Sequence, residues 1–245
     1  MTHLLEICVD DPAGLAAAIQ GGAQRIELCA ALSAGGLTPS PGLIRLARQA
    51  PVPVLAMIRP RAGGFVYDAA EMRAALDDIA AIREAGLAGI VTGASHPDGR
   101  LDLENLARLR DAATGLEVVL HRAFDMTPDL DQALDQAAGL GLTRIMTAGG
   151  NLSAPADPVR AIARLALRAA GRIQIMAGGR SVTPETAGPL LRAGADDLHA
   201  ACAEILPDQP RTEVLGIPGR RPQTSAAQVA RLRAAMDAAM GRDAG

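Results

Sequence analysis

The chain has 245 residues, 49% of them hydrophobic, and a formal net charge of −3. It contains no run of basic residues, which argues against nucleic acid as a partner. No apolar stretch approaches the roughly 20 residues that a membrane-spanning helix needs, so we expect no membrane partner either. Three cysteines at unrelated spacings, and the lack of a signal-peptide pattern, favour a reducing and therefore cytoplasmic compartment.

Lysine is absent from the chain, since all 24 basic residues are arginine. Schiff-base catalysis needs the primary amine of a lysine side chain. The composition therefore excludes the class I aldolases, the pyridoxal-phosphate barrels and any enolisation that uses a lysine base.

A glycine that follows an alanine-rich stretch recurs along the chain and precedes a short apolar strand each time. The four glycines are Gly22, Gly86, Gly141 and Gly194. Glycine suits the left-handed position that ends a helix, and the β-branched or leucine residue four places on suits a buried strand. Each interval leaves room for one more strand and two helices. Four such units predict a (β/α)8 barrel.

The remaining strands and the helix starts fit this arrangement. The additional strands are expected at residues 4–9, 54–59, 117–121 and 173–176. Helix starts are expected where a capping side chain precedes a proline, at Asp11, Ser40, Thr127, Asp157 and Thr183. Asp68 with Glu71 predicts a capping box, and Asp102 and Ser225 are further candidate caps. We predict one TIM-barrel domain over residues 1–245, with a C-terminal helix at about 225–240.

Alternation along the strands predicts which side chains point into the barrel. The inward positions collect five polar residues near the C-terminal mouth, which are Glu6, Glu27, Arg59, His121 and His199. We interpret these five as candidate catalytic residues and expect Glu6 or Glu27 to pair with Arg59, because an unpaired buried carboxylate is costly. Purely structural alternatives are a buried ion pair and satisfied core histidines.

The strand-to-helix loops add candidate ligand-binding residues at the same mouth. These are Arg61, Arg122, Asp125, Gly178 and Gly179. Arginine suits carboxylate or phosphate, and a glycine pair after the seventh strand can cradle an anion. A solvated Arg61 and a simple Gly-Gly tight turn are the alternatives.

The chain resembles the CutC copper homeostasis family. The resemblance rests on LEICVDDPAGLAAAIQGGAQRIELCAALSAGGLTPS, MIRPRAGGFVY, HRAFDM and IMAGGR, and runs from about Leu5 to Cys202. It implies a cytoplasmic (β/α)8 barrel that forms a homo-oligomer, a dimer or tetramer, and acts in copper tolerance and intracellular copper trafficking. It also implies copper binding through thiols, for which Cys8 and Cys29 are the matching positions.

Two classes of function follow. Cys8 and Cys29 are expected at a similar height on neighbouring strands, where two thiolates could bind Cu(I), although both could also be small buried hydrophobic residues. Cys202, in the turn after the last strand, is expected to be incidental. The alternative is an isomerase, lyase or hydrolase that acts on a small anionic, possibly phosphorylated, metabolite. A divalent metal with oxygen and nitrogen ligands has no supporting spacing motif.

Overall fold

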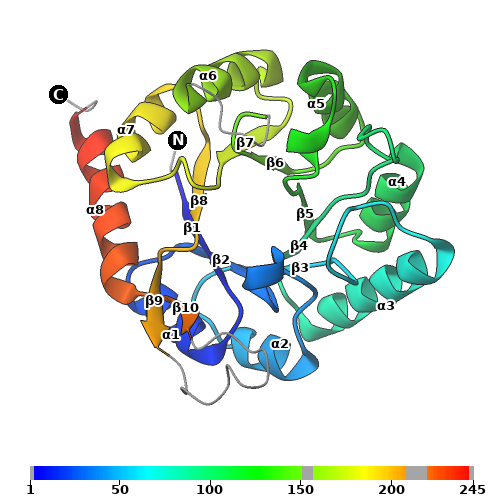
Figure 1. Cartoon of the computed structure of the whole chain (residues 1–245), viewed down its shortest axis with the longest axis horizontal. Coiled ribbons are helices and arrows are strands. Elements are labelled where there is room, and N and C mark those ends of the chain that lie inside the picture. Colours follow the sequence, from blue (N-terminus) through cyan, green and yellow to red (C-terminus); the bar gives the residue numbers. More distant parts are fainter. Residues whose placement is uncertain (1–2, 151–156, 208–219, 243–245) are drawn as a thin grey trace.

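The computed structural model describes residues 3–150, 157–207 and 220–242. Its centre is a closed barrel of parallel strands in the order β1 to β8 (Figure 1). These strands are β1 Leu5–Val9, β2 Arg25–Leu28, β3 Val54–Met57, β4 Gly89–Thr92, β5 Glu117–Leu120, β6 Arg144–Thr147, β7 Gln174–Ala177 and β8 Asp197–Ala200. The predicted (β/α)8 barrel is therefore confirmed.

Eight helices form a ring outside the barrel (Figure 1). They are α1 Pro12–Gln20, α2 Pro41–Ala47, α3 Ala69–Ala85, α4 Leu103–Ala112, α5 Leu130–Gly139, α6 Pro158–Ala169, α7 Pro184–Arg192 and α8 Ala226–Arg242. Short 3-10 turns at Leu32–Ala34 and Phe124–Met126 lie in two of the loops above the strands. The helix expected at about 225–240 is α8.

The local signals act as the sequence indicates. All four repeat glycines adopt positive φ, as the chain leaves a helix for the next strand. Asp11, Ser40, Asp157 and Thr183 accept hydrogen bonds from the first turns of α1, α2, α6 and α7, and Asp68 forms the capping box of α3.

The expected start at Thr127-Pro128 is wrong. Helix α5 begins at Leu130 because the Asp129 carboxylate accepts from the amides of Asp131 and Gln132. The Thr127 hydroxyl instead donates to the carbonyl of Phe124.

Two further strands lie outside the barrel and were not expected from the sequence. β9 Ala203–Pro207 pairs antiparallel with β10 Arg220–Thr224. Figure 1 shows this pair beside α1 and near the start of α8. β9 is exposed along its whole length, and Ile205 retains 63% of its accessible surface.

The apolar core has two parts. The larger part lies between the strands and the helices, and the smaller part fills the barrel interior. The interior cluster consists of Cys29, Leu55, Met57, Val91, Val119, Met146 and Met176. Met57 and Val119 lie two residues before Arg59 and His121, so these interior residues follow the inward alternation expected for their strands. No helix in the described part of the chain is both long and apolar enough to cross a membrane.

Glycine is required at Gly141 by the backbone conformation and at Gly89 by the lack of space for a Cβ, and alanine substitutions can test the two causes separately. Gly141 has φ of +71° and open space where a Cβ would be, so Gly141→Ala should cost about 1 kcal/mol for the left-handed backbone alone. A Cβ on Gly89 in β4 would lie 2.6 Å from the backbone oxygen of Glu117. Since no side-chain rotation relieves that contact, Gly89→Ala should cost about 3 kcal/mol. Urea unfolding measures both, and the opposite ranking would contradict the packing of β4 against β5.

Candidate functional site

A cavity of about 670 Å³ opens at the C-terminal end of the barrel strands. Four of the five candidate catalytic residues line it: Glu27, Arg59, His121 and His199. Cys8 lines it too, and Met57, Phe65 and Met146 supply much of its apolar wall. The fifth candidate, Glu6, lies below the floor with 0% of its surface exposed. The structure thus brings the predicted set to one mouth, with Glu6 beneath the other four.

The buried ion pair differs from the expected one. Glu6 pairs with Arg25, whose Nε donates to its Oε2 at 2.5 Å, and not with Arg59. Nη2 of the same guanidinium donates to Asp197 Oδ2 at 2.8 Å. The cause is the strand register, which places Glu6 opposite Arg25 on the neighbouring strand. Burial alone would raise the pKa of Glu6, but Arg25 and His199 lower it to about 2.

Arg59 donates to backbone carbonyls, and no carboxylate in the described part of the chain pairs with it. Its Nη1 donates to the oxygens of Ala34 and Gly36 at 2.8 and 3.0 Å, and its Nη2 donates to Gly63 at 2.6 Å. Arg59 follows the end of β3, so its side chain reaches the loops above the barrel and not Glu27 within it. The expected pairing of Arg59 with Glu6 or Glu27 is therefore wrong.

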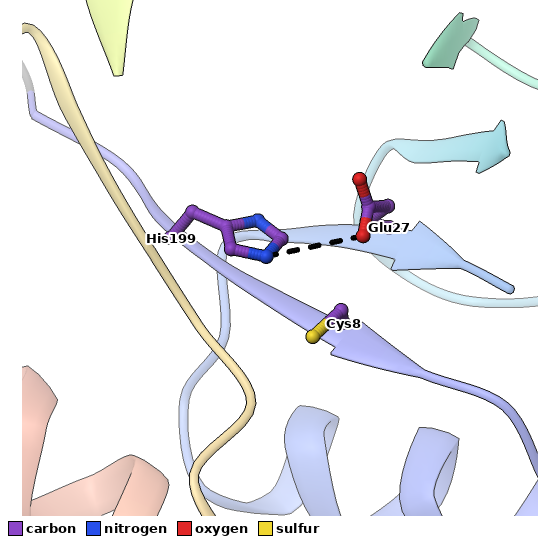
Figure 2. Close-up of side chains that lie close together, drawn as sticks. All are labelled: Cys8, Glu27 and His199. Atoms are coloured by element: carbon purple, nitrogen blue, oxygen red, sulfur yellow. Dashed lines mark ion pairs between the residues drawn. The ribbon is translucent and has the colours of Figure 1, made fainter. Parts of the chain in front are cut away.

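Figure 2 shows Cys8, Glu27 and His199, which come together from β1, β2 and β8. One potential ligand atom of each lies within 4.8 Å of the others. His199 Nδ1 is 2.8 Å from Glu6 Oε1, and its Nε2 is 3.8 Å from Glu27 Oε2. Burial would lower the pKa of His199, but its neighbours Glu27, Cys8 and Glu6 raise it well above the ordinary value. The pKa of Glu27 is raised, mainly by burial.

Cys8 and Cys29 are not at one height. The register pairs Cys8 with Glu27, so Cys29 lies two residues nearer the C-terminal mouth, directly after the end of β2. Cys29 is fully buried, and its thiol donates to Glu27 Oε2 at 3.5 Å. Burial and the charge of Glu27 raise the pKa of the Cys29 thiol well above its usual range. Cys8 lines the cavity, whereas the buried Cys29 does not.

His121 is buried and neutral. Its Nδ1 accepts from the Ala123 amide at 3.1 Å, which leaves the ring proton on Nε2. Burial and the nearby Arg59 charge lower its pKa to about 3. The Phe65 ring packs against it with 4.5 Å between ring centroids. A Cβ on Gly93 would lie 2.4 Å from the imidazole, so only glycine leaves room for the ring.

The candidate residues in the loops separate into two groups. Arg122 and Gly179 line the cavity, whereas Arg61, Asp125 and Gly178 do not. Arg61 turns outward to Glu71. Asp125 accepts from Thr147, Arg122 and the amides of Ala148 and Gly150, so its role here is to hold the loop after β6.

Three further residues of the site, Arg25, Asp197 and Phe65, were not expected from the sequence. Arg25 and Asp197 occupy the first inward position of β2 and β8, two residues before Glu27 and His199, so strand alternation contained the signal. Phe65 reaches the cavity from a loop, for which alternation gives no signal. Cys202, expected to be incidental, lines the cavity, and burial raises its pKa to about 11.

Arg25→Met should lower the free energy of unfolding by about 3–5 kcal/mol, because it removes the buried cation that Glu6 and Asp197 share and leaves each acid with one remaining partner, His199 or Arg144. Arg164→Met is the control, since its pair with Asp131 is half exposed and should change stability by less than about 1 kcal/mol. Chemical denaturation of both variants gives the comparison. Similar small losses would show that the buried pair does not stabilise the fold.

The pKa of His121 predicts a pH dependence. Because its folded pKa of about 3 lies below the ordinary 6.5, its contribution is present above pH 6.5 and is lost as pH falls from 6.5 towards 3. His121→Asn should flatten the decline in unfolding free energy by up to about 1.4 kcal/mol per pH unit in this window. Urea unfolding at several pH values tests this, with His96→Asn as the exposed control. Parallel profiles for wild type and His121→Asn would contradict it.

Comparison with known proteins identifies the family. The CutC family model matches residues 3–204. The CutC family protein of Sinorhizobium medicae is 51% identical over 238 residues, 96% of each chain, and that of Rhizobium meliloti is 48% identical over 237 residues with the same coverage.

Solved structures agree. The crystal structure of a candidate copper homeostasis protein CutC from Streptococcus agalactiae is 34% identical, with a TM-score of 0.77, and covers 82% of this chain and 99% of that one. Phosphoribosylanthranilate isomerase from Thermotoga maritima, at 12% identity and a TM-score of 0.58, covers 97% of this chain and 100% of its own and shares the fold alone. The family model, the relatives and the Streptococcus structure together show that the chain belongs to the CutC family.

Proposed function

We propose that this chain acts in copper homeostasis and binds Cu(I) as its cargo at Cys8 and His199. The observation that carries the proposal is the convergence of Cys8, Glu27 and His199, whose potential ligand atoms lie within 4.8 Å of one another at the cavity (Figure 2). Membership of the CutC family and the printed name of the Streptococcus agalactiae relative, which mentions copper homeostasis, favour copper as the ion.

The three clustered side chains differ in the ions that they prefer. Thiolate and imidazole are good ligands for Cu(I), whereas a carboxylate prefers harder ions. Glu27 therefore serves better as the neighbouring charge than as the main ligand. Because His199 must lose its proton before it can bind a metal, copper binding releases a proton from the site.

Glu6 supports this assignment from beneath the cavity. A histidine that binds a metal through one ring nitrogen usually donates a hydrogen bond from the other ring N–H, often to a carboxylate, and this contact fixes the orientation of the ring. His199 Nδ1 makes that contact with Glu6 at 2.8 Å, and Arg25 holds Glu6 in turn. The ring is thereby fixed with Nε2 towards Glu27 at the cavity wall.

Cys29 is the proposed second thiol. Its sulfur already contacts Glu27, which is a member of the same cluster. Its raised pKa makes it harder to ionise, so we propose that Cys8 binds the ion first and that Cys29 contributes less to affinity. A cytoplasmic location, where thiols stay reduced, and a homo-oligomeric assembly complete the proposal, both on the resemblance to the family.

Anaerobic Cu(I) competition titrations against a chromogenic chelator test the site. Cys8→Ser and His199→Gln should each weaken Cu(I) binding at least about tenfold, and Glu6→Gln about tenfold through the orientation of His199. Cys29→Ser should have a smaller effect.

Cys202→Ser is the matched control, because Cys202 lies at the same cavity but outside the cluster. Equal affinities for wild type and the Cys8→Ser/His199→Gln double variant would remove copper from this site.

A further inference from the structure

Seven buried side chains present a polar atom without a hydrogen-bond partner among the described residues, and three of these side chains line the cavity. They are Glu27 Oε1, Arg59 Nε and His121 Nε2. The residues are 3%, 6% and 3% exposed, respectively. An unsatisfied buried polar group costs about 1–3 kcal/mol. Copper at Cys8 and His199 leaves Arg59 and His121 unsatisfied, because both of these are donors. A ligand with acceptor atoms would satisfy these two donors.

The charge of Arg59 indicates the kind of ligand. No described carboxylate lies within ion-pair distance of its guanidinium. Glu71, in the first turn of α3, pairs with Arg61, and Asp125, in the 3-10 turn after β5, pairs with Arg122. Three carbonyl contacts hold the Arg59 guanidinium in place, so little side-chain entropy is lost when an anion binds. A fixed and uncompensated cation at a cavity wall favours a ligand with one negative charge.

His121 adds a neutral donor beside this cation. Its tautomer is set by the Ala123 amide, so Nε2 carries the hydrogen. Phe65 joins the two groups, since its ring packs against His121 and lies 5.2 Å from the Arg59 guanidinium carbon. One oxygen of a carboxylate could accept a hydrogen bond from the charged Arg59, and the other could accept one from the neutral His121 imidazole.

The rest of the cavity indicates the remainder of the ligand. Its wall includes the apolar side chains of Met57, Phe65, Met146 and Val182, and its volume of about 670 Å³ suits a small molecule. Glu27 Oε1, at the floor, offers an acceptor for a hydroxyl group. We propose that the cavity binds a small hydroxycarboxylate, with its carboxylate at Arg59 and His121 and its hydroxyl towards Glu27. This ligand is additional to the proposed copper ion.

Thermal shift and calorimetry with 3-hydroxybutyrate, butyrate and inorganic phosphate test the proposal. Wild type should gain melting temperature with increasing 3-hydroxybutyrate, less with butyrate and least with phosphate, because binding to the folded state alone stabilises it. The shift should disappear in Arg59→Met. Arg61→Ala is the matched control, since Arg61 belongs to the same loop but turns outward to Glu71, and it should keep the full shift.

Two substitutions of His121 distinguish a loss of ligand binding from a loss of folding. Asn can accept from the Ala123 amide but has no donor at the Nε2 position, whereas Gln offers a donor there. His121→Asn should lose binding at least tenfold, and His121→Gln should recover part of it. Cys8→Ser should keep the hydroxycarboxylate response while it loses Cu(I), so the two proposals fail separately. No shift in wild type at millimolar ligand, a strongest response to phosphate, or equal binding by Arg59→Met would overturn the proposal.

Discussion

The Arg25 guanidinium, buried between Glu6 and Asp197, links the floor of the barrel to its mouth. Arg144 contacts the same Asp197 from β6 at 3.2 Å, and Glu6 passes the interaction on to His199. Charges of alternating sign thus run from the first residues of the strands to the cavity. A buried cation stabilises two carboxylates, and one of these carboxylates orients the imidazole on which the proposed copper site depends.

The contact with Arg25 also makes the two buried glutamates of the barrel differ in pKa. Glu6 has its pKa lowered by Arg25, while Glu27, one layer nearer the mouth, has its pKa raised by burial. The two histidines differ in the same way. His199 lies between carboxylates and holds its proton, whereas His121, near Arg59 and fully buried, stays neutral. The cavity therefore has an acidic, thiol-bearing side on β1, β2 and β8, and a donor side formed by Arg59 and His121.

This division would allow one mouth to hold both proposed ligands, the copper ion and the hydroxycarboxylate. The side with Cys8 and His199 offers soft donors for a monovalent metal ion. The side with Arg59 and His121 offers hydrogen-bond donors and a positive charge. Glu27 lies in the cluster with Cys8 and His199, and its second oxygen has no partner among the described residues.

The sequence alone determined the barrel, because glycine stops, capping residues and two-residue alternation are local properties that each repeat displays. It also determined that Glu27, Arg59, His121 and His199 point into the mouth. It could not determine partners across strands. The stagger between β1 and β2 sets Glu6 opposite Arg25 and Cys8 opposite Glu27, and no local pattern encodes that offset. Strand alternation also could not predict the contacts of Arg59 and Phe65, because both residues lie beyond the end of β3. There, the packing of the loops holds the Arg59 guanidinium on backbone carbonyls. Tertiary structure alone decided these contacts, because they join residues that are distant in the chain or lie in loops without a repeating backbone geometry.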